Sequence, residues 1–174
     1  MNRTLRNLGI ALTAICATTV IGNAGRVYAG STTNDVYFDG TVTSACSFSG
    51  NTSGTLVPDP GAAYRLQAGE LNGTAGTLTI NCNATATVTI EDPVKMAGPN
   101  LSAGSVAGSW LDVSGTDVVG SPQGIIWYGT LSASRNVAAN TTESYGVHMR
   151  VENGNQDPLQ SGAYQFKTTV TATY

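Results

Sequence analysis

The strongest constraint on the fold is a strict alternation of two residue sets at the carboxyl end of the chain. The first set would share one face of a strand: Tyr164, Phe166, Thr168, Val170, Ala172 and Tyr174. The intervening set is polar: Gln165, Lys167, Thr169, Thr171 and Thr173. Because side chains of a β-strand point to opposite faces with a period of two, this pattern predicts a half-buried final strand.

A second alternation, between Thr77 and Glu91, has inward positions at Leu78, Ile80, Cys82, Ala84, Ala86, Val88 and Ile90. It is long for one strand, so we expect a bend within residues 81–85. Shorter strands are expected at residues 55–57, 110–113, 125–128 and 145–151, whereas residues 62–70 have mild helical character. About seven to nine strands with turn signals between them, and no convincing helix, predict an all-β sandwich.

Residues 36–42 predict an opening strand that runs on to Cys46. Its apolar face carries Val36, Phe38, Gly40 and Val42. A glycine inside a strand marks either a bulge or the close approach of a neighbouring group. Two interpretations follow. The segment is an ordinary first strand with a bulge, or it is a strand that serves a neighbouring molecule.

Residues 1–29 have the features of a secretory signal peptide. Arg3 and Arg6 precede a mostly apolar run, and Ala29 suits the cleavage site, with Ala24 as a second candidate. The run is too short for a comfortable membrane span, and no later stretch is long and apolar enough to insert into a bilayer. We therefore expect export of the chain.

Cleavage of the leader would remove Cys16 and leave Cys46 and Cys82. An even pair in an exported protein predicts one disulfide. On the loop-entropy description, closing a loop of this length stabilises a fold by about 4 kcal/mol. Two cysteines and the single histidine, His148, are too few soft ligands for a metal site, and no cofactor is expected.

The charge and side-chain inventory exclude several function classes. The leader holds three of the 8 basic residues and none of the 11 acidic ones, so the remaining chain has 5 basic and 11 acidic residues and a net charge of −6. This argues against nucleic acid and anionic membranes as partners. No Ser/His/Asp set or Cys/His pair with a free thiol can be assembled around His148, so we do not expect an enzyme.

Two other constellations have ordinary structural explanations. Asp112 and Asp117 lack the ligand spacing of a calcium loop, so a solvated turn is expected there. Trp110, Trp127 and Tyr128 could stack on sugars, but aromatic residues within predicted strands more often belong to a core.

These motifs together resemble the chaperone–usher pilins, the fimbrial subunits of Gram-negative bacteria. The resemblance rests on Val36-x-Phe38-x-Gly40-x-Val42 followed by Cys46, on Cys82 inside an alternating strand, and on the ending Gly162-Ala163-Tyr164 to Tyr174. It is closest to the archaic branch that includes spore-coat-U-like subunits. Residues 93–142 match no part of the family. The chain departs from the family in two ways: the spacing from Gly40 to Cys46 is about one residue shorter than in classical pilins, and Tyr174 is terminal, whereas the family's tyrosine is usually penultimate. Either the register is shifted by one residue or the chain belongs to a divergent branch, so the exact donor residues stay open.

The resemblance implies an immunoglobulin-like sandwich over residues 45–174 that lacks its last strand, preceded by a donor-strand extension at residues 30–44. A periplasmic chaperone would first lend the missing strand, and an outer-membrane usher would pass the subunit to the cell surface. In the fibre, the next identical or related pilin subunit would donate its extension by β-strand addition. Carried over by position, the groove-filling residues would be Val36, Phe38, Gly40 and Val42. The groove edge and chaperone docking edge would be Tyr164, Phe166, Thr168, Val170, Ala172 and Tyr174.

The expected function is therefore a structural subunit of a cell-surface fimbria that supports adhesion. The alternative is a self-complete secreted β-sandwich that binds a carbohydrate or another host ligand, in which residues 36–42 pair within their own domain.

Overall fold

The computed structural model describes residues 34–71 and 73–174, and the leader predicted at residues 1–29 lies outside them, as do residues 30–33. The contacts divide the chain between Gly40 and Thr41 into two units, which we describe separately. Residues 34–45 form no helix or strand. The prediction of a strand through residues 36–46 is wrong for the chain by itself, because the first paired strand begins at Cys46.

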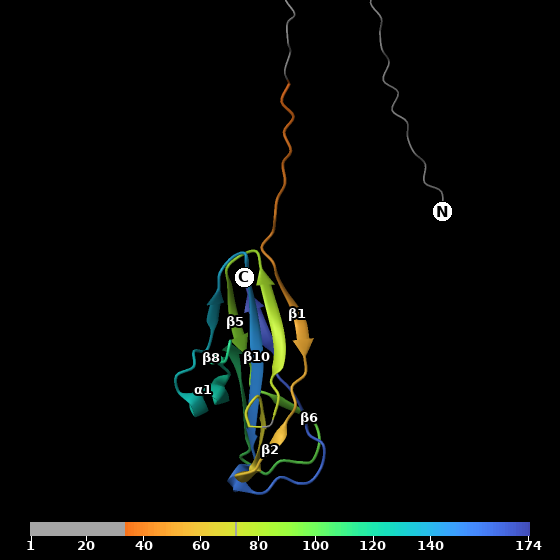
Figure 1. Cartoon of the computed structure of the whole chain (residues 1–174), viewed down its shortest axis with the longest axis vertical. Coiled ribbons are helices and arrows are strands. Elements are labelled where there is room, and N and C mark those ends of the chain that lie inside the picture. Colours follow the sequence, from red (N-terminus) through yellow and green to blue (C-terminus); the bar gives the residue numbers. More distant parts are fainter. Residues whose placement is uncertain (1–33, 72) are drawn as a thin grey trace, which may run out of the picture. The chain divides into compact units, whose positions relative to one another are not determined.

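The larger sheet belongs to the unit Thr41–Tyr174 and is antiparallel (Figure 1). Its strands follow the order β1-β4-β10-β3-β2, and β7 pairs with both β10 and β8. Their bounds are β1 Cys46–Thr52, β2 Val57–Asp59, β3 Ala62–Ala68, β4 Gly76–Cys82, β7 Val106–Val113, β8 Thr116–Gly120 and β10 Thr141–Glu152. β1 therefore forms one edge of this sheet and β8 lies at the opposite side.

The second layer consists of two short antiparallel sheets, ordered β12-β5-β9 and β11-β6. Their bounds are β5 Ala86–Ile90, β6 Val94–Ala97, β9 Arg135–Val137, β11 Gln165–Lys167 and β12 Val170–Thr173. Val170 pairs with Ile90, and Phe166 pairs with Lys95. The carboxyl-terminal segment thus runs in two pieces along β5 and β6. Its alternating set is partly buried from Tyr164 to Ala172, as the sequence predicts, whereas Tyr174 is exposed.

The core lies between the two layers and explains the sandwich-like arrangement. It consists of Leu78, Ile80, Cys82, Ala86, Val88, Ile90, Leu111, Val119, Val137 and Tyr145. The inward positions predicted between Thr77 and Glu91 are largely confirmed, and so is the bend, because β4 ends at Cys82 and β5 begins at Ala86. The all-β class predicted from the sequence is correct.

Two local predictions are wrong. Residues 62–68, with mild helical character, form β3, because pairing with β10 on one side and β2 on the other overrides helical propensity. Residues 125–128, predicted as a strand, belong to helix α1, Pro122–Tyr128. A 3₁₀ turn at Gly154–Gln156 is the other helical element of the described residues.

Candidate functional site

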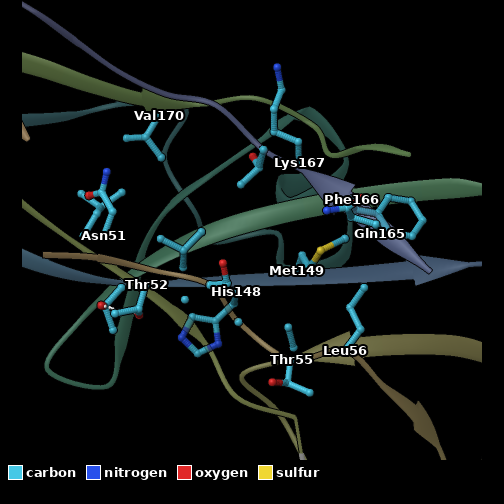
Figure 2. A pocket seen from close by; sticks show the side chains of 18 of the residues that line it. Asn51, Thr52, Thr55, Leu56, His148, Met149, Gln165, Phe166, Lys167 and Val170 are labelled. Carbon is cyan, nitrogen blue, oxygen red and sulfur yellow. Dashed lines mark hydrogen bonds between the residues drawn. The ribbon is translucent and has the colours of Figure 1, made fainter. Parts of the chain in front are cut away.

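A groove of about 720 Å³ opens between β1 with the segment that follows it and the carboxyl-terminal segment (Figure 2). We call this feature the edge groove. It is lined by Phe48 and residues 51–56 on one wall, and by residues 164–168 and Val170 on the other. Its size and apolar content make it the main candidate site of the described residues.

The wall that begins with β1 is shaped by its register on β4. Phe48 pairs with the fully buried Ile80, so its side chain lies on the inner face, yet it remains 42% exposed. After a bulge between Ser49 and Thr52, two backbone hydrogen bonds between Thr55 and Thr74, of 2.9 and 3.2 Å, hold the wall. An exposed aromatic ring on the inner face of a sheet edge is consistent with a surface that receives another apolar group.

The opposite wall is the inward set of the final alternating segment. Tyr164, Phe166, Thr168 and Val170 are half-buried and line the edge groove, whereas the intervening residues are exposed. The Thr168 hydroxyl donates to the Glu91 carbonyl oxygen at 2.7 Å, which fixes the junction between β11 and β12. The other two predicted edge residues lie outside the lining: Ala172 packs against the core, and Tyr174 is 58% exposed.

The floor of the edge groove joins it to the core. Ala68 and Leu78 are buried, while Val147 and Met149 from β10 are half-buried. Val147 also packs against the core cluster. Apolar side chains at the base of an open groove are consistent with a binding surface for an apolar segment.

Both walls carry strand edges without a described pairing partner. Within the described strands, β1 pairs with β4 alone, β11 with β6 alone and β12 with β5 alone. Their outer N–H and C=O groups can therefore accept another strand. In Figure 2, the chain runs from Thr52 to Leu56 in one direction and from Gln165 to Val170 in the other. A strand between the walls would be antiparallel to one and parallel to the other.

The predicted donor residues are exposed in the unit that contains them. Val36 is 70% exposed and Phe38 92% exposed, and Val42, at the start of the second unit, is 86% exposed. Large apolar side chains that are exposed on a short unpaired segment form a surface suited to binding another apolar surface.

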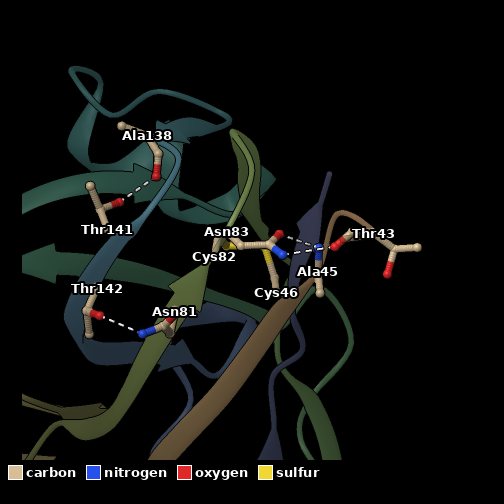
Figure 3. Close-up of a disulfide and its surroundings, with 9 residues drawn as sticks. All are labelled: Thr43, Ala45, Cys46, Asn81, Cys82, Asn83, Ala138, Thr141 and Thr142. Carbon is tan, nitrogen blue, oxygen red and sulfur yellow. Dashed lines mark hydrogen bonds between the residues drawn. A yellow bond between two sulfur atoms is a disulfide. The ribbon is translucent and has the colours of Figure 1, made fainter. Parts of the chain in front are cut away.

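The disulfide predicted from the sequence is present between Cys46 and Cys82, the residues that also pair in the β1–β4 register. Next to it, Asn83 contacts the chain just before β1 (Figure 3). The Ala45 N–H donates to Asn83 Oδ1 at 2.7 Å, and Asn83 Nδ2 donates to the Thr43 carbonyl oxygen at 2.9 Å. We call these two side-chain hydrogen bonds the amide clamp.

The aromatic and acidic candidates on the outer face of the larger sheet have structural roles. Trp110 is 1% exposed and stacks on His148, with ring centroids 5.5 Å apart, while the Tyr128 ring packs against it at a tilt, with centroids 4.7 Å apart. Burial, followed by a hydrogen bond to Glu70, raises the pKa of Tyr128 to about 12. Asp112 accepts the Gly115 N–H at 2.7 Å, which is a turn contact. The described residues contain no cluster of three or more metal-ligating side chains of the His, Cys, Asp and Glu types.

The sequence reasoning missed the floor and the amide clamp. Ala68 and Met149 come together only because β3 joins the carboxyl half of β10, a pairing that no local pattern specifies. An asparagine within the bend expected at residues 81–85 was the available signal for Asn83, since such side chains often satisfy nearby backbone groups.

No known family model and no curated protein matches the chain. In the part of the chain that the structure describes, no helix is long and apolar enough to cross a membrane.

Proposed function

We propose that this protein is a structural subunit of a cell-surface fibre and that it polymerises by β-strand addition. Residues 36–42 of one copy enter the edge groove of the next copy and complete its sandwich, which is then an immunoglobulin-like fold lacking its own last strand. The observation that carries the proposal is the groove between two unpaired strand edges, with an apolar floor.

The length and periodicity of the two partners match. Residues 36–42 and residues 164–170 are segments of equal length, each about 20 Å when extended. With Val36, Phe38 and Val42 facing the floor, every second donor residue contacts apolar side chains. The intervening positions face solvent, and Gly40 allows the backbone to approach the floor closely.

Backbone pairing and apolar burial provide the binding free energy. The inserted strand gains hydrogen bonds to both walls, antiparallel to one and parallel to the other. Burying Val36, Phe38 and Val42 contributes on the order of 5 kcal/mol or more. Insertion of one copy into the next is a heterologous contact that does not close, so the product is a filament.

The edge groove also explains why the subunit would need a chaperone and an usher during export. An apolar groove with unpaired edges is prone to aggregation, so a periplasmic chaperone that lends a strand would protect it until an outer-membrane usher assembles the fibre. This part of the proposal rests on the resemblance to chaperone–usher pilins.

A synthetic peptide of residues 34–44 tests the proposal. We expect it to bind the full chain, kept monomeric at low concentration, and to raise the unfolding temperature by tens of degrees, because it pairs with both walls. The control is the same peptide with Gly40→Tyr, which adds a bulky side chain where the backbone must approach the floor.

The control peptide should change the unfolding temperature little. Equal stabilisation by both peptides would contradict specific insertion. A full chain that unfolds as a stable monomer and ignores the natural peptide would instead favour a self-complete, ligand-binding sandwich.

A further inference from the structure

Asn83 extends the pairing of β1 beyond the end of β4. Its backbone N–H donates to the Ala45 carbonyl oxygen at 3.0 Å, and its side-chain oxygen accepts the Ala45 N–H at 2.7 Å. Its side-chain nitrogen donates to the Thr43 carbonyl oxygen at 2.9 Å. Since β4 stops at Cys82, the asparagine amide takes the place of the next residue of a strand and holds residues 43–45 beside the end of β4.

We infer that Asn83 is a positioning residue that keeps each extension out of its own groove and so commits it to a second copy. The inference rests on the proposed function, because it concerns which copy fills the edge groove. The role of Asn83 follows from the geometry of intramolecular insertion, in which residues 36–42 fold back along β1 of the same chain.

Folding back requires a sharp reversal at the residues that the amide clamp holds. Three residues, 43–45, span at most about 10 Å, so the donor segment could lie only antiparallel to β1. A tight hairpin reversal needs residues with positive φ, usually glycine or asparagine. No described residue before Gly50 has a positive φ, and residues 43–45 are Thr, Ser and Ala.

Folding back onto the same chain and insertion into a second copy therefore differ in whether the hydrogen bonds of the amide clamp are lost. A reversal at residues 43–45 turns the Thr43 carbonyl and the Ala45 N–H away from Asn83, so both clamp hydrogen bonds are lost. Insertion into a second copy needs no reversal at residues 43–45, so both hydrogen bonds can remain. Two neutral hydrogen bonds shift the ratio of intermolecular to intramolecular insertion by roughly tenfold or more.

The test compares Asn83→Ala with Asn81→Ala in the full chain. Asn81 is a matched control, because it also bonds through its side-chain nitrogen, at 2.8 Å, but to Thr142 rather than to the segment before β1. Each protein is unfolded with its disulfide intact and refolded at low concentration, and its monomers are isolated. Hydrogen exchange of residues 34–44 and uptake of the 34–44 peptide are then measured.

For Asn83→Ala, we expect the fraction of monomers with a protected extension and no peptide uptake to rise roughly tenfold over Asn81→Ala. A loss of stability alone would not protect the extension, so this readout separates positioning from a structural role. An unprotected extension with peptide uptake equal to that of Asn81→Ala would overturn the inference. If wild-type monomers do not take up the peptide at all, the proposed function fails instead.

Asn83→Asp keeps the test informative if the alanine variant does not fold. Its carboxylate still accepts the Ala45 N–H but repels the Thr43 carbonyl oxygen. We expect a protected fraction between those of the wild type and Asn83→Ala. A value equal to that of the wild type would count against a role for the Thr43 contact.

Discussion

Glu143 is a residue that couples the fold to pH. Its carboxylate accepts two hydrogen bonds from Arg135, at 3.0 and 3.2 Å, and one from the Tyr145 hydroxyl. The hydrogen bond from Arg135 is the main reason that the pKa of Glu143 is lowered from its ordinary value of 4.5, although burial opposes it. The charged carboxylate is thus favoured in the folded state over the unfolded state.

We expect the stabilising effect of Glu143 to be present above pH 4.5 and to be lost as the pH falls through the lowered pKa. Glu143→Gln should therefore be less stable than the wild type at pH 7, and the difference should shrink in acid. Unfolding temperatures between pH 7 and pH 3 measure it. Asp157→Asn, which removes one exposed charge from a loop, is the control, and a difference that grows in acid would contradict the assignment.

Single-residue features that depend on local pattern were predictable. The disulfide followed from the even number of cysteines left after the leader, and the burial of Cys82 followed from its place in an alternating strand. The role of Asn83 was not predicted, because its contacts with residues 43–45 depend on where β1 begins. The sequence placed a strand from Val36 onward, whereas pairing with β4 starts at Cys46.

At the scale of elements, α1 shows where periodicity is ambiguous. A short apolar run such as residues 125–128 is compatible with a buried strand or with a helix, and its pattern cannot decide between them. Pro122 was the overlooked signal, because proline is favoured at the first position of a helix. The helix covers the outer face of β7, which accounts for the burial of Trp110.

Gly108 is the contact point between β7 and α1, and we predict that Gly108→Val destabilises the fold by about 1–3 kcal/mol. A Cβ at Gly108 would lie 2.6 Å from the Gly124 nitrogen and 2.8 Å from Trp127 Cζ3. Backbone at this distance cannot yield without moving the helix. Denaturant unfolding followed by tryptophan fluorescence measures the change.

Thr171→Val serves as the control for that experiment. Thr171 is exposed on β12, in the other layer, so the substitution should alter the free energy of unfolding by less than about 0.5 kcal/mol. A Gly108→Val protein as stable as this control would mean that α1 is not closely packed on β7.

The edge groove was predictable in part. The inward set of the final segment supplied one wall, since Tyr164, Phe166, Thr168 and Val170 alternate in the sequence and line the groove. The other wall and the floor depend on contacts between strands distant in the sequence. Phe48 belongs to β1, where the sequence pattern predicted no strand.

At the scale of the whole molecule, adjacent residues of the extension should differ sharply in their effect on assembly. Phe38 is 92% exposed and Tyr37 82% exposed, but the proposed insertion buries only Phe38. We predict that Phe38→Ser weakens binding of one copy to the next by about 2 kcal/mol, or roughly thirtyfold. Tyr37→Ser should leave it nearly unchanged.

Sedimentation of the refolded full chain over a range of concentrations measures this difference. The two variants control for each other, because both replace an exposed aromatic residue with serine in the same segment. If Tyr37→Ser weakens assembly more than Phe38→Ser does, the inserted strand has a register shifted by one residue. Equal assembly of both variants would contradict insertion of this segment.

The opposite directions of the two groove walls also bear on mechanics. In a fibre built as proposed, tension pulls each inserted strand lengthwise between two edges. Hydrogen bonds across a strand are then loaded in shear and must fail together, whereas a strand peeled from one edge loses them one at a time. The resistance of this contact to a sudden force would depend on its rupture rate. Under fluid flow over a cell surface, that rate would matter more for the fibre than the equilibrium affinity between subunits.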